Sequence, residues 1–142
     1  MQLEGYFIDK YEVTVTQWQT YAAATSAETP NQTGRHFDTP KAPLMPAAAI
    51  SWKQAQAYAA WAGKALPSEA QWEKAARGPD GRLYPWGNTA PTPDHGHFGT
   101  REKLPELYAL VGSYPIGTSP YGALDMLGNQ YEWTSEWLAP YP

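Results

Sequence analysis

The residues best suited to chemistry lie near the end of the chain, in the run from Tyr121 to Trp137. Asp125, Gly128, Gln130 and Glu132 follow one another at spacings of three, two and two. A bent backbone would bring two carboxylates and two main-chain carbonyls around one hard cation. Calcium takes roughly six to eight oxygen ligands of these kinds. This pattern is therefore compatible with one calcium site.

The same residues also fit a turn that binds no metal. Gly128 and Asn129 both tolerate positive φ, so together they can reverse the chain. Glu132 would then face solvent between a buried Tyr131 and a buried Trp133. On spacing alone the plain turn is the simpler interpretation.

Four motifs resemble the formylglycine-generating enzyme family, also called the sulfatase-modifying-factor domain. They are FIDKYEVT, LPSEAQWEKAARG, YPWGN and YGALDMLGNQYEWTSEW, starting at Phe7, Leu66, Tyr84 and Tyr121. Their order and spacing match the family, and the resemblance covers nearly the whole chain. It implies a variant of the C-type-lectin-like fold. It also implies structural calcium held by the Asp125 and Glu132 side chains and the Gly128 and Gln130 carbonyls, with Tyr131 where the family usually has Trp.

The resemblance implies an activity that these residues cannot supply alone. Enzymes of the family use oxygen and a copper ion held by two cysteines to oxidise a sulfatase cysteine to formylglycine. Those cysteines lie beyond the EW motif, and this chain has no cysteine. The histidine motif of the related sulfoxide synthases is absent too. We expect the N-terminal and central part of the family domain, with no catalytic residue here and copper only if a C-terminal segment supplies its ligands.

Two other function classes stay open. The first alternative is a non-catalytic module that binds a protein or peptide ligand on a C-type-lectin-like scaffold. The second is a structural domain of a larger surface or signalling protein. If the C-terminal part is missing, Trp133 and Trp137 lose cover, so self-association or pairing with a complementing segment is expected.

Composition indicates a small, loop-rich domain, and the resemblance implies an α+β fold. Its 142 residues suit a single domain over 1–142, and 14 prolines and 12 glycines predict short elements joined by ordered loops. A net charge of −4 without a basic run disfavours nucleic acid and anionic membranes. There is no signal-peptide core or membrane-length apolar run, so a cytoplasmic location is the default.

Three helices and a small mixed or antiparallel sheet are expected to position the turn. The helices begin after Thr14, Ser51 and Ser68, each followed three residues later by Gln in a capping box, and Gly63 and Gly78 end the last two. Short strands are predicted within 3–13 and 107–116.

The loops hold all three histidines. His36, beside Arg35 and Asp38, is expected on a solvated surface of the 25–46 loop. His95 and His97 lie near Asp94, but a transition-metal site there would need more ligands than the chain offers.

Overall fold

The computed structural model describes residues 3–28, 40–98 and 107–137, and within them it has three α-helices and two short 3-10 turns. The helices are α1 (Val15–Thr25), α2 (Trp52–Trp61) and α3 (Glu69–Arg77), and the 3-10 turns are η1 (Ala42–Leu44) and η2 (Pro115–Gly117). All three predicted capping boxes are present, so the helix starts predicted from sequence are confirmed. Gly63 and Gly78, with φ of 70° and 69°, follow α2 and α3 as predicted.

The helices pack around two separate apolar centres. In the first, aromatic rings of α1 and α2 interlock, with Trp18 stacked on Tyr58 at 5.5 Å and Tyr21 edge-on to the same ring at 5.4 Å. In the second, α3 buries Ala75 and Ala76 against Ala123 and Met126. Small residues on α3 therefore let the backbone before the predicted calcium turn approach the helix closely.

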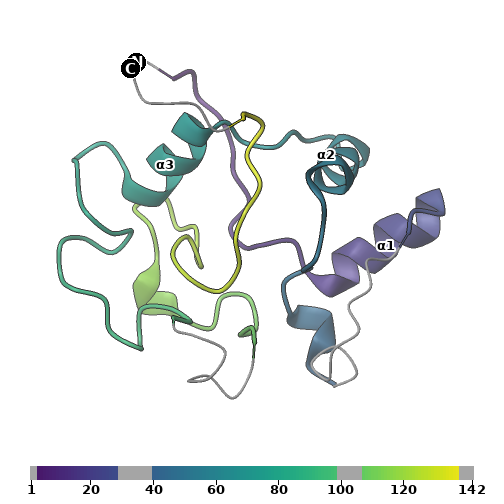
Figure 1. The fold of residues 1–142 in the computed structure, drawn as a ribbon. Coiled ribbons are helices and arrows are strands. Elements are labelled where there is room, and N and C mark those ends of the chain that lie inside the picture. The colour runs from purple at the N-terminus through teal and green to yellow at the C-terminus, as the bar shows by residue number, and fades with distance from the viewer. Residues whose placement is uncertain (1–2, 29–39, 99–106, 138–142) are drawn as a thin grey trace.

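Two segments run between these centres in place of the predicted sheet. Figure 1 shows residues 3–14, in purple, and the C-terminal segment to 137, in yellow, passing between α3 on one side and α1 and α2 on the other. The Tyr6 hydroxyl donates to the Gln71 carbonyl at 2.6 Å, and the Leu124 amide donates to the Lys10 carbonyl at 2.9 Å. Single bonds of this kind tie the first segment to both neighbours.

The predicted strands within 3–13 and 107–116 are wrong. The described residues contain only two isolated antiparallel bridges, Thr14 with Pro46 and Tyr84 with Gly87. Residues 3–13 form no strand ladder, because their hydrogen bonds go singly to different segments and not in series to one neighbouring strand. In the second, Gly112 takes a φ of 75° and the Ser113 amide bonds to the Leu110 carbonyl, so a turn and then η2 replace an extended run.

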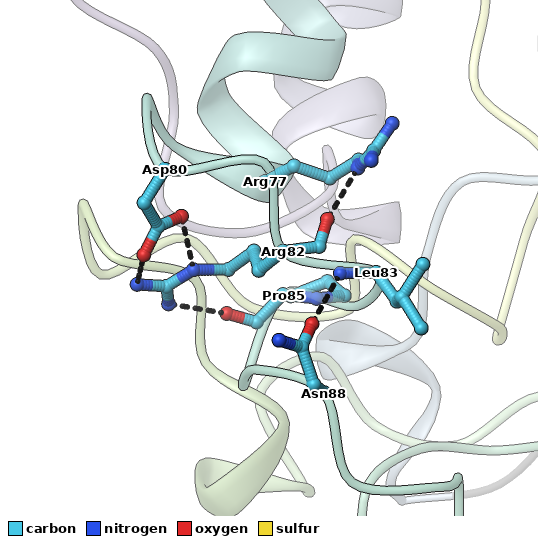
Figure 2. A network of polar contacts seen from close by, with 6 residues as sticks. All are labelled: Arg77, Asp80, Arg82, Leu83, Pro85 and Asn88. Carbon is cyan, nitrogen blue, oxygen red and sulfur yellow. Dashed lines mark hydrogen bonds and ion pairs between the residues drawn. The ribbon is translucent and has the colours of Figure 1, made fainter.

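The loop after α3 is held by its own polar side chains. Arg82 forms two bonds to the Asp80 carboxylate, at 2.8 and 2.7 Å, and donates to the Pro85 carbonyl (Figure 2). Its own carbonyl accepts from Arg77 on α3, while Asn88 accepts from the Leu83 amide. Arg77 also bonds to Glu73 at 2.5 Å, an ion pair between residues one helical turn apart on the surface of α3.

The last described segment lies along the starts of α2 and α3. The indole of Trp52 donates to the Thr134 carbonyl, and the indole of Trp133 donates back to the Ile50 carbonyl, both at 2.8 Å. The Glu136 carboxylate accepts from the first amide of α3 at 2.7 Å, where the helix dipole favours negative charge. In the described part of the chain, no helix is long and apolar enough to cross a membrane.

Candidate metal centre

Asp125 is a buried carboxylate in a backbone conformation that few side chains adopt. Only 7% of the residue is exposed, and its φ is 60°. One carboxylate oxygen, Oδ2, accepts a 2.6 Å bond from the Gly112 amide. Burial raises the pKa of Asp125, and the Gly112 amide opposes that rise. The positive φ turns the chain at the first predicted ligand, as a ligand loop requires.

Gly128 lies where the turn has no room for a side chain. Its φ is 95°, and a Cβ there would stand 2.8 Å from the His97 carbonyl oxygen. Asn129 follows with a φ of 57°, so the prediction that both residues take positive φ is confirmed. The Asn129 amide donates to the same His97 carbonyl at 3.0 Å. The turn is thus packed directly against the His97 carbonyl and the ring of Phe98.

Glu132 is held by an indole of α3. Its Oε2 accepts from Trp72 Nε1 at 2.5 Å. The residue as a whole is exposed, yet the protein atoms packed around its carboxylate desolvate it. This desolvation, and then the charge of Asp125, raises the pKa of Glu132, while the indole bond lowers it. The bond to Trp72 is the feature that the solvent-facing interpretation of Glu132 did not predict.

The neighbours of Glu132 also differ from the plain-turn interpretation. Tyr131 is fully exposed and Trp133 is 49% exposed, so neither is buried as that interpretation required. Gln130 is partly buried, and its side-chain Oε1 accepts from the Tyr131 amide at 3.2 Å.

Sequence reasoning missed a third carboxylate, Glu12. Its Oε2 accepts from Asn129 Nδ2 at 2.7 Å, while Oε1 is buried without a hydrogen-bond partner among the described residues. Desolvation, joined by the charges of Asp125 and Glu132, raises the pKa of Glu12 to about 8, against the lowering effect of Asn129 and the Gln130 amide. Glu12 belongs to the FIDKYEVT motif, but nothing in the spacing of that motif links it to a turn 117 residues later.

These residues form an acidic region in which every atom that could bind a metal is an oxygen. No Lys or Arg side chain is among the groups that shift the pKa of Glu12, Asp125 or Glu132. A buried carboxylate oxygen without a partner and two more carboxylates with raised pKa fit a site that receives a hard cation. Within residues 3–28, 40–98 and 107–137, however, no three side chains of His, Cys, Asp or Glu stand close enough to hold a metal by themselves. Any site here must therefore use main-chain carbonyls as well as carboxylates.

The histidines of the described residues serve aromatic packing. The His95 ring stacks on Trp86 at 4.3 Å, and its Nδ1 lies 2.8 Å from the Thr92 hydroxyl. His97 Nδ1 lies 3.3 Å from the Tyr114 hydroxyl. Neither ring belongs to a group that holds a metal in the described residues. The predictions for Arg35, His36 and Asp38 lie outside the described residues.

Comparison with known proteins defines the class to which this fold belongs. The sulfatase-modifying factor enzyme 1-like domain matches residues 1–142, so the chain belongs to that family. Hercynine oxygenase of Mycolicibacterium thermoresistibile is 44% identical over 104 residues, which cover 70% of this chain and 23% of the relative. Formylglycine-generating enzyme of Mus musculus is 36% identical over 118 residues, covering 72% and 32%.

The name of a third relative describes it as inactive. "Inactive C-alpha-formylglycine-generating enzyme 2" of Bos taurus is 40% identical over 99 residues, which cover 63% of this chain and 32% of the relative. The match spans less than a third of each of these three relatives. The resemblance stated from the four motifs is confirmed at the level of the family.

Proposed function

We propose that this chain is the calcium-stabilised scaffold part of a formylglycine-generating-type protein. The observation that carries the proposal is the buried Asp125 carboxylate at a positive φ, together with the partnerless Glu12 oxygen and the Glu132 carboxylate in the same region, with no cationic side chain among the groups that shift the pKa of the three. One calcium ion at the turn would take the Asp125 and Glu132 carboxylates and the Gly128 and Gln130 carbonyls. The ion neutralises charge and fixes the turn, and it takes no part in a reaction.

Calorimetric titration of the purified chain with calcium tests this site. We expect one ion bound per chain, and no binding by the Asp125→Ala variant. Asp80→Ala is the matched control, because Asp80 is an aspartate paired with Arg82 in a different loop. An Asp125→Ala variant that binds calcium as the parent does would exclude the site.

Catalysis of the family type requires ligands that these 142 residues lack. A copper ion would need two cysteines, and the chain has none, so they would have to come from another segment. We therefore expect no formylglycine formation by the chain alone. Incubation with a cysteine-containing sulfatase peptide, copper and oxygen tests this, and aldehyde above a no-protein control would contradict it.

An aromatic surface beside the turn favours a second role, in binding a polypeptide. Its members are Tyr131, Trp133 and Trp137, which are 100%, 49% and 88% exposed. Each such ring can bury on the order of 200 Å². In the C-type-lectin-like arrangement that the resemblance implies, this surface would receive a complementing C-terminal segment, another protein, or a second copy of the chain.

Light scattering on a size-exclusion column tests whether a second copy is the occupant. We expect species above the 15.7 kDa monomer mass, and a loss of them in a Tyr131→Ser, Trp137→Ser variant. A single monomer whose melting does not depend on concentration would show that the chain needs no second copy.

A further inference from the structure

Glu12 reaches the predicted calcium turn from the opposite end of the chain. Its segment is pinned on both sides, because the Lys10 carbonyl accepts from the Leu124 amide and the Val13 carbonyl accepts from the Ala47 amide. The carboxylate therefore meets the turn from a fixed backbone. Its Oε2 receives the side-chain amide of Asn129 at 2.7 Å.

Asn129 connects Glu12 to the two predicted carbonyl ligands. It stands between Gly128 and Gln130, and its Oδ1 accepts from the Ala109 amide at 2.9 Å. Its backbone amide donates to the His97 carbonyl at 3.0 Å. That amide shares a planar trans peptide with the Gly128 carbonyl, so the bond to His97 directs the Gly128 oxygen to the opposite side. The contacts of Asn129 thus determine the orientation of the first carbonyl.

The next peptides of the turn are also restrained. The Gln130 amide lowers the pKa of the Glu12 carboxyl, and the Tyr131 amide donates to Gln130 Oε1. The Tyr131 amide shares its peptide plane with the Gln130 carbonyl, so this bond orients the second predicted carbonyl ligand. Of the main-chain amides in this turn, only that of Gln130 acts on Glu12, and the two predicted ligand carbonyls belong to the peptides before and after the Asn129–Gln130 peptide.

When it is ionised, Glu12 also adds a negative charge that no described group neutralises. Its Oε1 has no hydrogen-bond partner among the described residues, and a buried polar atom in that condition destabilises a fold. Glu12 does not complete a three-residue metal group with Asp125 and Glu132 in the described structure. Glu12 therefore does not bind the ion directly. It contributes to calcium affinity as a residue near the ligands, because hydrogen-bonded neighbours hold ligands in place and negative charge raises affinity.

We propose that Glu12 is a positioning residue of the calcium site, which holds the turn from Gly128 to Gln130 in place through Asn129 and, when it is ionised, attracts the divalent ion. This inference rests on the calcium site proposed above. It assigns to the N-terminal FIDKYEVT motif a role in a site whose ligands all lie in the C-terminal motif.

Two substitutions at position 12 separate position from charge. Glu12→Ala removes both the bond to Asn129 and the charge, and we expect calcium affinity to fall about 10- to 100-fold, as for other residues that support metal ligands. Glu12→Gln keeps an oxygen for Asn129 and removes only the charge. We expect a loss of about three- to tenfold, the effect of one unit charge on a divalent ion several ångströms away in a water-like medium.

The measurement is a calorimetric calcium titration of the whole chain at about pH 9, above the pKa of about 8 at which Glu12 loses its proton. The circular dichroism spectrum and the melting temperature in chelator are recorded for each variant. Glu4→Gln, which removes an exposed carboxylate from the same segment, is the matched control and should bind as the parent does. In chelator, Glu12→Gln should melt no lower than the parent, because it removes a buried acid and retains the hydrogen bond. A merely structural role would lower both stability and affinity.

The outcomes separate the two proposals. A parent chain that binds no calcium overturns the calcium site, and the role of Glu12 with it. A parent that binds calcium, with folded Glu12→Ala and Glu12→Gln variants of unchanged affinity, overturns the role of Glu12 alone. Should Glu12→Ala fail to fold, Glu12→Gln decides the matter by itself.

Discussion

The loop at 78–88 and the turn at 125–132 treat their carboxylates in opposite ways. In the loop, Asp80 receives two bonds from Arg82, and this pairing lowers the pKa of Asp80 from 3.8 to about 2. In the turn, burial raises the pKa of Glu12, Asp125 and Glu132, and neighbouring carboxylates raise the pKa of Glu12 and Glu132 further. The loop therefore carries its own counter-ion, while no cationic side chain is among the groups that shift the pKa of the carboxylates of the turn.

Adding calcium should sharpen this contrast most. A ligand that binds only the folded state stabilises it by RT ln(1 + [L]/Kd), so calcium at about 100 times Kd contributes roughly 2.7 kcal/mol. We expect the chain to melt well below its calcium-bound temperature when chelator is present. Differential scanning calorimetry in chelator and in millimolar calcium measures the shift, and equal midpoints in the two buffers would contradict it.

Replacing one glycine of each region by alanine should show which region is packed more tightly, without any change of charge. Gly128→Ala places a Cβ 2.8 Å from the His97 carbonyl at a φ of 95°, and we expect a loss of at least about 2 kcal/mol in chelator. Gly81→Ala in the loop meets open space at a φ of 73°, and we expect only the left-handed penalty of about 1 kcal/mol. Urea unfolding of both variants measures the difference, and equal losses would show that the turn is no tighter than the loop.

The two regions should also respond to pH in opposite directions. The folded chain binds the Glu12 proton more tightly than the unfolded chain does, because the pKa of Glu12 rises from 4.5 to about 8. Its contribution to stability is complete below pH 4.5 and is lost as the pH rises to about 8. The contribution of Asp80 is complete above pH 3.8 and is lost as the pH falls through about 2.

Urea midpoints in chelator from pH 5 to pH 9 measure the response of the turn. We expect the free energy of unfolding of the parent to fall over this range and that of Glu12→Gln to change less. Asp80→Asn should follow the parent in the same range, since Asp80 is ionised throughout. A parent and a Glu12→Gln variant with identical pH profiles would show that Glu12 is not the titrating group.

The helices and the turn could be predicted from sequence because their signals are local. A capping residue and a Gln three positions later satisfy exposed amides within one turn, so Thr14, Ser51 and Ser68 mark their helix starts without reference to the rest of the fold. Gly128 and Asn129 likewise predict positive φ, because their residue types tolerate it.

The strands and Glu12 could not be predicted in the same way. A strand needs a partner along its length, and whether residues 3–13 find one depends on segments far away in the sequence. Glu12 meets Asn129 across 117 positions, and Trp72 meets Glu132 across 60, through bonds that no local spacing encodes. Of the candidate site, the resemblance therefore predicted the four ligands, and the structure showed which residues form hydrogen bonds to two of them, Asp125 and Glu132.

The smallest effect is expected from removing the cation of the loop. Arg82→Ala deletes the pair with Asp80 and the bond to the Pro85 carbonyl, but the Arg82 carbonyl still accepts from Arg77, and Asn88 still accepts from the Leu83 amide. Solvent and salt screen an exposed ion pair, so its loss hardly changes the free energy of unfolding. We expect a urea midpoint close to that of the control Lys53→Gln, with faster hydrogen exchange confined to the loop. A fall as large as that of Gly128→Ala would mean that the arginine pair stabilises the whole domain, and the contrast between a self-sufficient loop and a cation-dependent turn would fail.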